Sequence, residues 1–151
     1  MRITRRLEFD AGHRIAEHAS QCRHLHGHRY ALELTLEGEP LNRPGDTGNG
    51  MVLDFSHIKA IAYEHLVAHW DHAFLVWQED RAVCDFLQTL PGHKTVVLDF
   101  TPTVENLARH AFTLLAPRFR AQYGQALRLA RVRLYETPNC WADAAAEDCR
   151  V

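Results

Sequence analysis

The chain has 151 residues, 46% of them hydrophobic. This is enough for one domain that buries its own core without disulfide bonds or a structural metal. Its formal net charge is -2, with 17 basic and 19 acidic residues, and this excludes the broad positive surface that binds nucleic acids or anionic membranes. We therefore expect one domain over residues 1–151 and a small molecule, not a nucleic acid or a membrane, as its partner.

The N-terminal residues alternate charged and apolar side chains, and no apolar run approaches the ~20 residues that span a bilayer. This pattern predicts a soluble, cytoplasmic protein. The four cysteines form no C-x-x-C pair, so in a reducing compartment they are free thiols unless one has a chemical task. The compositional oddity is a total of 11 histidines.

Two strands with one apolar face are predicted near the N-terminus. Residues 3–15 place Leu7, Phe9 and His13 on one face and charged side chains on the other. Residues 26–36 repeat the alternation, and the two strands are candidates for an antiparallel pair. The Gly-, Pro- and Asn-rich stretch that follows, residues 39–50, reads as an exposed loop.

The remaining elements alternate between helical periodicity and short apolar runs. Residues 56–70 and 101–119 carry apolar stripes at helical spacing behind Asp, Ser or Thr caps, and predict the two main helices. The other expected elements are a loop at 70–80, a short helix at 83–90, a strand at 94–100 and a strand at 127–136 with a bulge near Arg131. The fold class is α+β, with a mostly antiparallel sheet of four strands.

The segment CRHLHGH, residues 22–28, carries the clearest chemical signal. His26 and His28 are two apart on a strand, so both imidazoles leave the same face, roughly 7 Å apart at the backbone. His13 lies on the apolar face of the neighbouring strand. Three inward imidazoles require compensation, and Zn²⁺ bound by neutral ring nitrogens supplies it, so we assign these three as zinc ligands. His24 shares the alternation, and spacing alone does not exclude it.

Cys22 has two readings. Its neighbours Arg23 and His24 favour a thiolate, which can serve as a general base or nucleophile beside an open metal position. Alternatively, it is the fourth ligand of a closed, structural zinc site in a protein that is not an enzyme.

Three further residues are candidates for the chemistry. Asp71 and His72 form an adjacent acid and imidazole pair that suits proton transfer, or, with Asp71 as base, a zinc-water hydrolase. Glu136 continues the inward face of its strand, so its carboxylate needs a donor partner. A planar ligand with adjacent N–H groups would satisfy this carboxylate through two parallel hydrogen bonds. The alternative partner is an internal Arg or a backbone cap.

These residues fall in an order that resembles a known family. The segments are FDAGH at 9–13, CRHLHGHRY at 22–30, GMVLDF at 50–55, WDH at 70–72, PTVEN at 102–106 and YET at 135–137. The pattern resembles the 6-pyruvoyl-tetrahydropterin and 6-carboxy-tetrahydropterin synthases over nearly the whole chain. The resemblance implies the T-fold (tunnelling fold), with subunits combining their sheets into a barrel, as a hexamer of two trimers with active sites between subunits.

The resemblance also implies a role for each matched residue. His13, His26 and His28 match the zinc ligands, which leaves His24 as a neighbour. Cys22, Asp71 and His72 match the catalytic residues, Glu136 matches the carboxylate that anchors the pterin ring, and Glu105 falls at the glutamate of the Pro-Thr-x-Glu-Asn motif, where we expect it to line the pocket. After the Asp-His pair the family often has Leu-Asn, whereas here Leu75 precedes Val76.

The implied reaction converts 7,8-dihydroneopterin triphosphate. The short chain and its cysteine-to-histidine spacing resemble the carboxy branch, which releases triphosphate and acetaldehyde and feeds 7-deazaguanine and queuosine biosynthesis. The pyruvoyl branch, which feeds tetrahydrobiopterin, is the alternative. The phosphate-binding residues have no motif; Arg14, Arg23 and Lys59 are candidates.

Overall fold

The two N-terminal strands form where the sequence alternates between apolar and polar side chains. In the computed structural model, which describes residues 1–149, β1 spans Arg2–His13 and β2 spans His26–Gly38. They pair antiparallel, with Leu7 opposite Leu32 and His13 opposite His26. The predicted antiparallel pair is confirmed.

Both predicted main helices are present. The first is a continuous helical segment made of α1 (Phe55–Ala62), a π-helical turn η2 (Tyr63–Val67) and α2 (Ala68–Trp70). The second is α4 (Val104–Tyr123). Asp54 accepts the N–H of Ser56 at the start of α1, and Thr103 accepts the N–H of Asn106 at the start of α4, so both helices begin at predicted caps.

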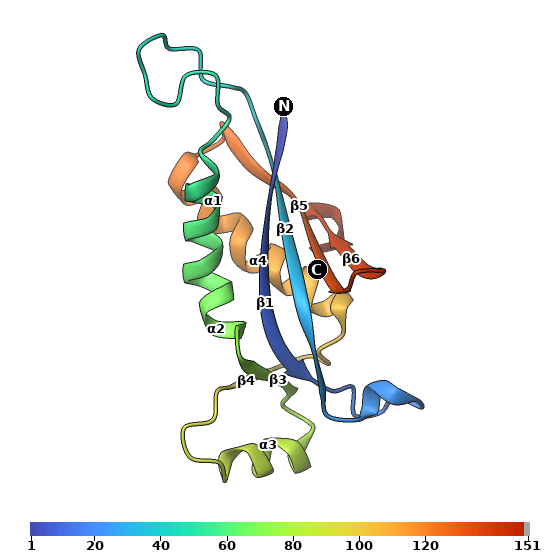
Figure 1. Cartoon of the computed structure of the whole chain (residues 1–151). Coiled ribbons are helices and arrows are strands. Elements are labelled where there is room, and N and C mark those ends of the chain that lie inside the picture. The colour runs from blue at the N-terminus through green and yellow to red at the C-terminus, as the bar shows by residue number, and fades with distance from the viewer. Residues whose placement is uncertain (150–151) are drawn as a thin grey trace.

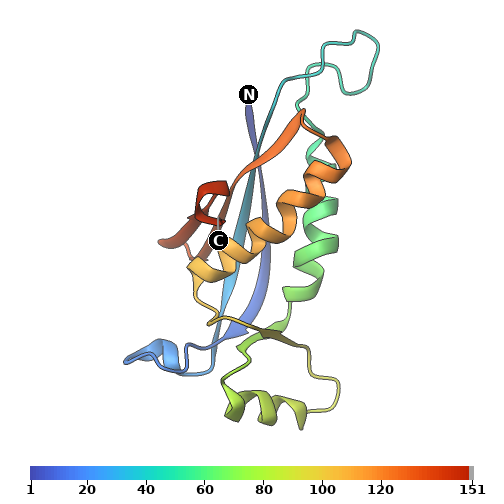
Figure 2. The ribbon, with the colours of Figure 1, turned by 180° about the vertical axis from the view of Figure 1, so that it is seen from behind.

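The helices cover one face of the sheet (Figures 1 and 2). The core lies between them and the sheet, where the largest fully buried residues include Leu32, Leu34, Leu134, Leu107 and Leu115. The opposite face carries cross-strand pairs of Arg and carboxylate, such as Arg6 with Glu33 at 3.3 Å. The predicted α+β class is therefore confirmed, and the helices pack on one face of the sheet.

Within residues 1–149 the sheet has six strands, not the four expected, in the order β4-β3-β1-β2-β5-β6. β3 (Ala73–Trp77) occupies the segment predicted as a loop, and it pairs in parallel with both β1 and β4 (Thr95–Leu98). The loop prediction was wrong because β3 lies between two strands and is largely buried, so its side chains form an unbroken apolar run with no alternation to detect. The predicted short helix is α3 (Arg81–Gln88).

The C-terminal strands form a hairpin. β5 (Leu127–Thr137) pairs antiparallel with β2, and its register shifts between Leu129 and Arg131, which confirms the predicted bulge. β6 (Cys140–Ala144) was not predicted, because its five residues show no clear alternation of apolar and polar side chains. Among residues 1–149, no helix has the length and apolar character needed to cross a bilayer.

Candidate functional site

Three histidines meet at the paired ends of β1 and β2. His13 lies opposite His26, and His28 lies opposite Ala11, so alternation sends all three imidazoles to the helix-covered face. One ring nitrogen from each lies within 4.8 Å of the other two. This histidine trio can therefore hold a metal ion, in the arrangement that the strand alternation predicted.

The hydrogen bonds of the histidine trio leave its metal-binding nitrogens free. His13 Nδ1 lies 2.8 Å from the carbonyl oxygen of Pro102, and His26 Nδ1 lies 2.7 Å from that of His24. A carbonyl only accepts, so each Nδ1–H donates, and Nε2 is the ring nitrogen left to face a metal. The buried Nε2 atoms of His13 and His28 have no hydrogen-bond partner among the described residues. Zn²⁺ binds imidazole nitrogens that converge in this way, so the residues fit the metal.

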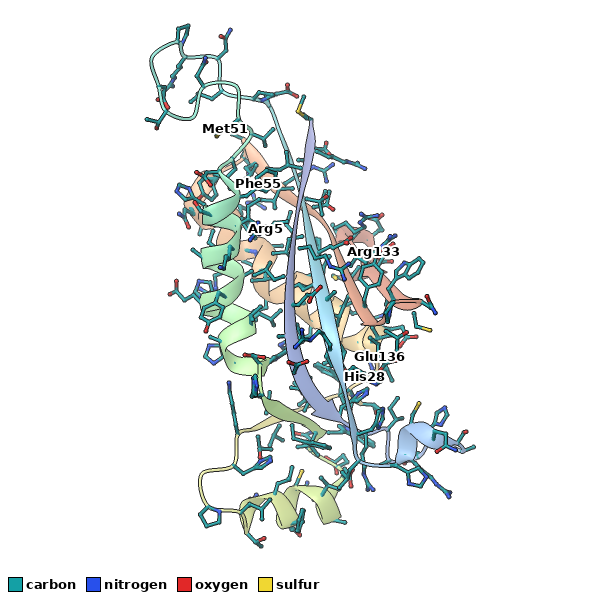
Figure 3. All side chains as sticks on the ribbon, in the orientation of Figure 1. Arg5, His28, Met51, Phe55, Arg133 and Glu136 are labelled. Carbon is teal, nitrogen blue, oxygen red and sulfur yellow. The ribbon has the colours of Figure 1, made fainter. Side chains whose placement is uncertain are left out.

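Glu136 completes this cluster from β5. Its Oε1 lies 3.2 Å from His13 Nε2 and 3.5 Å from His28 Nε2, and Figure 3 shows His28 and Glu136 side by side. The close approach of His13, followed by that of the other two imidazoles, holds the pKa of Glu136 below its usual range although burial opposes this. Burial lowers the pKa of His28. A half-buried carboxylate thus lies beside the histidine trio, with capacity for further donors.

Asp71 and His72 lie on the other side of the sheet. Asp71 Oδ1 accepts the N–H of Asp10 at 3.0 Å and lies 3.0 Å from His72 Nδ1. Burial opposes the charged form of Asp71, but the hydrogen bonds from Asp10 and His72 hold its pKa below the usual value. The carboxylate of Asp10, which joins this cluster, is paired with Arg29 on the face that no helix covers. Within this chain, the Asp71–His72 pair and the histidine trio therefore lie on opposite faces of the sheet.

A surface hollow of about 490 Å³ adjoins the Asp71–His72 pair. Gly12 and Gly27 lie side by side across β1 and β2 and leave this part of the sheet without side chains. Its polar lining residues are Asp10, His28, Arg29, His72 and His93. His72 has a positive φ of 59°, a left-handed conformation that non-glycine residues adopt at a cost. The hollow therefore presents the His72 imidazole, whose side chain is 77% exposed, to an approaching molecule.

Comparison with known proteins identifies the family. The family model described as 6-pyruvoyl tetrahydropterin synthase matches residues 2–147. The chain belongs to this family. The 6-carboxy-5,6,7,8-tetrahydropterin synthases of Rickettsia felis and Haemophilus influenzae are 36% and 31% identical to it, over 95% and 94% of this chain and 99% and 96% of theirs.

Solved structures show that the fold is that of the 6-pyruvoyl tetrahydropterin synthases, the predicted T-fold. An uncharacterised protein from Wolinella succinogenes superposes with a TM-score of 0.78 at 23% identity, covering 97% of this chain and 98% of that one. The 6-pyruvoyl tetrahydropterin synthase of Plasmodium vivax superposes with a TM-score of 0.67 at 19% identity, covering 95% and 97%.

In this member of the pterin synthase family, Cys22 lies outside the cluster of nitrogen donors. It is in η1 (Gln21–Arg23), a short helical turn between β1 and β2, where the N–H of Ile15 donates to its carbonyl oxygen at 2.8 Å. Within the described residues, the group around the histidine trio that can hold a metal contains no thiol. The arrangement therefore favours an open metal position over the closed site of one cysteine and three histidines.

Two further positions named from the sequence are Glu105 and His24. Glu105 is exposed in the first turn of α4, and the carbonyl of Pro102, just before this helix, accepts from His13. His24 contributes its backbone carbonyl to His26, so its position agrees with the role of a neighbour.

Sequence reasoning missed the residues that support the histidine trio from elsewhere. Pro102 is far from β1 along the chain. The only local signal there was the Thr-Pro-Thr segment, which predicted the start of a helix but not a contact with His13. Tyr30 is fully buried beside His13 and His28, with ring centroids 5.9 and 5.7 Å away. Burial raises the pKa of the Tyr30 hydroxyl, and the charge of Glu136 raises it further, so this hydroxyl stays protonated. In the sequence Tyr30 is only one more position on an apolar face.

Gly27 keeps the two ligand strands in contact, and Gly27→Ala is expected to disturb the histidine trio. A Cβ at this position would lie 2.9 Å from the backbone oxygen of Ala11, so the strands must shift apart between His26 and His28. We expect a lower melting temperature and zinc affinity reduced by about 10-fold, the loss seen when supporting groups of a site are disturbed. Gly45→Ala in the exposed loop is not a suitable control, because Gly45 has a φ of 90° and alanine would strain the backbone there. Ala60→Gly in α1 is a better one, since it should lower stability by about 1 kcal/mol without changing zinc affinity.

Proposed function

We propose that the protein is a zinc-dependent 6-carboxy-5,6,7,8-tetrahydropterin synthase that acts on 7,8-dihydroneopterin triphosphate. The observation that carries the proposal is the set of three imidazoles with converging ring nitrogens beside the Glu136 carboxylate. The names of the curated relatives support the carboxy branch, and a place in the 7-deazaguanine route to queuosine is part of the same proposal.

The histidine trio would hold Zn²⁺, with the carbonyls of Pro102 and His24 fixing two of the imidazoles. When bound, the metal supplies Lewis acidity to the side-chain hydroxyls of the pterin, which makes neighbouring protons easier to remove. Glu136 would receive the guanidine-like edge of the ring through two parallel hydrogen bonds, which fixes the reacting carbons relative to the metal.

Cys22, Asp71 and His72 would move the protons. Cys22 as a thiolate takes a proton from the side chain, and the Asp71–His72 pair supplies or returns one. Because this pair lies on the face opposite the histidine trio, we propose that it serves the active site of a neighbouring subunit, as a hexamer with interfacial sites requires. The exposed imidazole of His72 in its surface hollow supports this arrangement.

The decisive experiment is incubation of the zinc-loaded protein with 7,8-dihydroneopterin triphosphate, followed by mass analysis of the products. Triphosphate, acetaldehyde and 6-carboxytetrahydropterin are expected. Formation of 6-pyruvoyltetrahydropterin without acetaldehyde would instead assign the pyruvoyl branch. This branch is the second candidate, because the matching family model is described as 6-pyruvoyl tetrahydropterin synthase. Full activity after thiol alkylation would contradict the role of Cys22 and favour a zinc-water hydrolase.

Glu136→Gln should weaken pterin binding and leave the metal in place. The amide keeps the shape of the carboxylate but loses its charge and one of the two acceptors for the ring edge, so we expect a dissociation constant about 10–100-fold higher. Zinc content should stay near that of the wild type. Isothermal titration with neopterin and metal analysis measure the two quantities, and an unchanged affinity would remove Glu136 from the ring-binding role. Glu17→Gln is a matched control outside the site.

A further inference from the structure

The buried hydroxyl of Tyr30 has no hydrogen-bond partner among residues 1–149, although the Tyr30 side chain is fully buried. Buried hydroxyls in proteins normally have a partner, and one without a partner disfavours the folded state. Packing does not require the hydroxyl either. The Tyr30 ring stacks on Phe9 at a centroid distance of 5.3 Å, and Phe9 fills its own position on the same face as a plain phenyl ring.

The position of Tyr30 identifies the group that it can serve. The pairing of β2 with β5 ends at Ala31 and Tyr135, and Tyr30 and Glu136 are the next residue of each strand beyond this last pair. Both side chains lie on the helix-covered face, as Leu32 and Leu134 do. The Tyr30 ring also lies within 6 Å of the two imidazoles, those of His13 and His28, that the Glu136 carboxylate contacts.

A metal bound to the histidine trio would change the contacts of Glu136. In this structure its Oε1 faces the Nε2 atoms of His13 and His28, the atoms that a metal requires. With these nitrogens committed to the metal, the carboxylate must turn to other donors. The ring edge of a pterin supplies two donors and leaves carboxylate lone pairs unused, and Tyr30 has a hydroxyl to donate.

We propose that Tyr30 is a positioning residue for Glu136, its hydroxyl donating to the carboxylate when a pterin is bound. The inference rests on the proposed function, since it assigns the group that orients the ring-binding carboxylate. Tyr30 itself contacts neither the metal nor the pterin. It acts through Glu136, so its contribution depends on the carboxylate being present.

Tyr30→Phe tests the proposal in the full-length, zinc-loaded protein, with neopterin, an oxidised pterin, as the probe. We expect zinc content to be unchanged and the dissociation constant for neopterin to rise about 10-fold, the loss of one hydrogen bond to a charged group. KM for the triphosphate substrate should rise with little change in kcat. Without pterin, the melting temperature should be equal to that of the wild type or higher by about 2–4 °C, because a hydroxyl without a protein partner is removed.

A double-mutant cycle separates positioning from direct contact. In a Glu136→Gln background, Tyr30→Phe should change neopterin affinity by less than about twofold, because the group through which Tyr30 acts is altered. Tyr63→Phe, at a tyrosine that is 53% exposed, is the matched control and should leave every quantity unchanged.

Three outcomes would overturn the proposal: unchanged neopterin affinity, a full loss of affinity that persists in the Glu136→Gln background, or a melting temperature that falls in the absence of pterin. A Tyr30→Phe variant that does not fold would also overturn the proposal, because it would show that the hydroxyl supports the fold itself. Failure of the proposed function is seen separately, as wild-type protein that binds no neopterin.

Discussion

Replacing His26 by alanine is expected to abolish stable zinc binding and turnover together. His26 supplies one of three nitrogens that lie within 4.8 Å of one another, and its Nδ1 is committed to the carbonyl of His24. Loss of a supporting outer group typically lowers metal affinity 10–100-fold, so loss of a direct ligand should cost at least about 100-fold. Metal analysis after dialysis measures the first quantity, and product formation measures the second.

His24→Ala is the matched control for this experiment. His24 is two residues away and exposed, and it contributes only its backbone carbonyl, which alanine retains. The variant should bind zinc and turn over as the wild type does. If His24→Ala released zinc while His26→Ala retained it, the assignment of the ligands within CRHLHGH would be wrong.

Replacing Cys22 by alanine should remove turnover but not zinc. The thiol lies outside the group of converging nitrogens, so about one zinc per subunit should remain, and the melting temperature should change little. Loss of a general base typically lowers kcat by about 10²–10⁴-fold. Metal analysis, thermal unfolding and product formation on one preparation give all three quantities.

The same variant decides between the two classes of function. Loss of both zinc and folding in Cys22→Ala would show that the thiol closes a structural site, and the protein would then have no open metal position for a substrate. Cys140→Ala, at an exposed cysteine on β6, controls for the general effect of removing a thiol and should be indistinguishable from the wild type.

Local patterns in the sequence predicted most of the secondary structure. Alternation gave β1, β2 and β5, and helical spacing with side-chain caps gave α1 and α4, because each signal lies within a few consecutive residues. β3 was missed because a strand buried between two neighbours shows no alternation, and β6 because five residues are too few for a pattern.

The candidate site also has a part that local sequence patterns predicted and a part that only the tertiary structure revealed. Alternation within two strands was enough to place the imidazoles of His13, His26 and His28 on one face, and the direction of Glu136 followed from its own strand. Three features needed the tertiary structure: the carbonyl of Pro102 beneath His13, the closeness of Tyr30 to Glu136, and the Asp71–His72 pair on the opposite face of the sheet. Each depends on how segments distant in the chain pack against one another. A sequence determines the face on which a side chain lies within its own strand, but the pairing of strands and the docking of helices decide what it meets there.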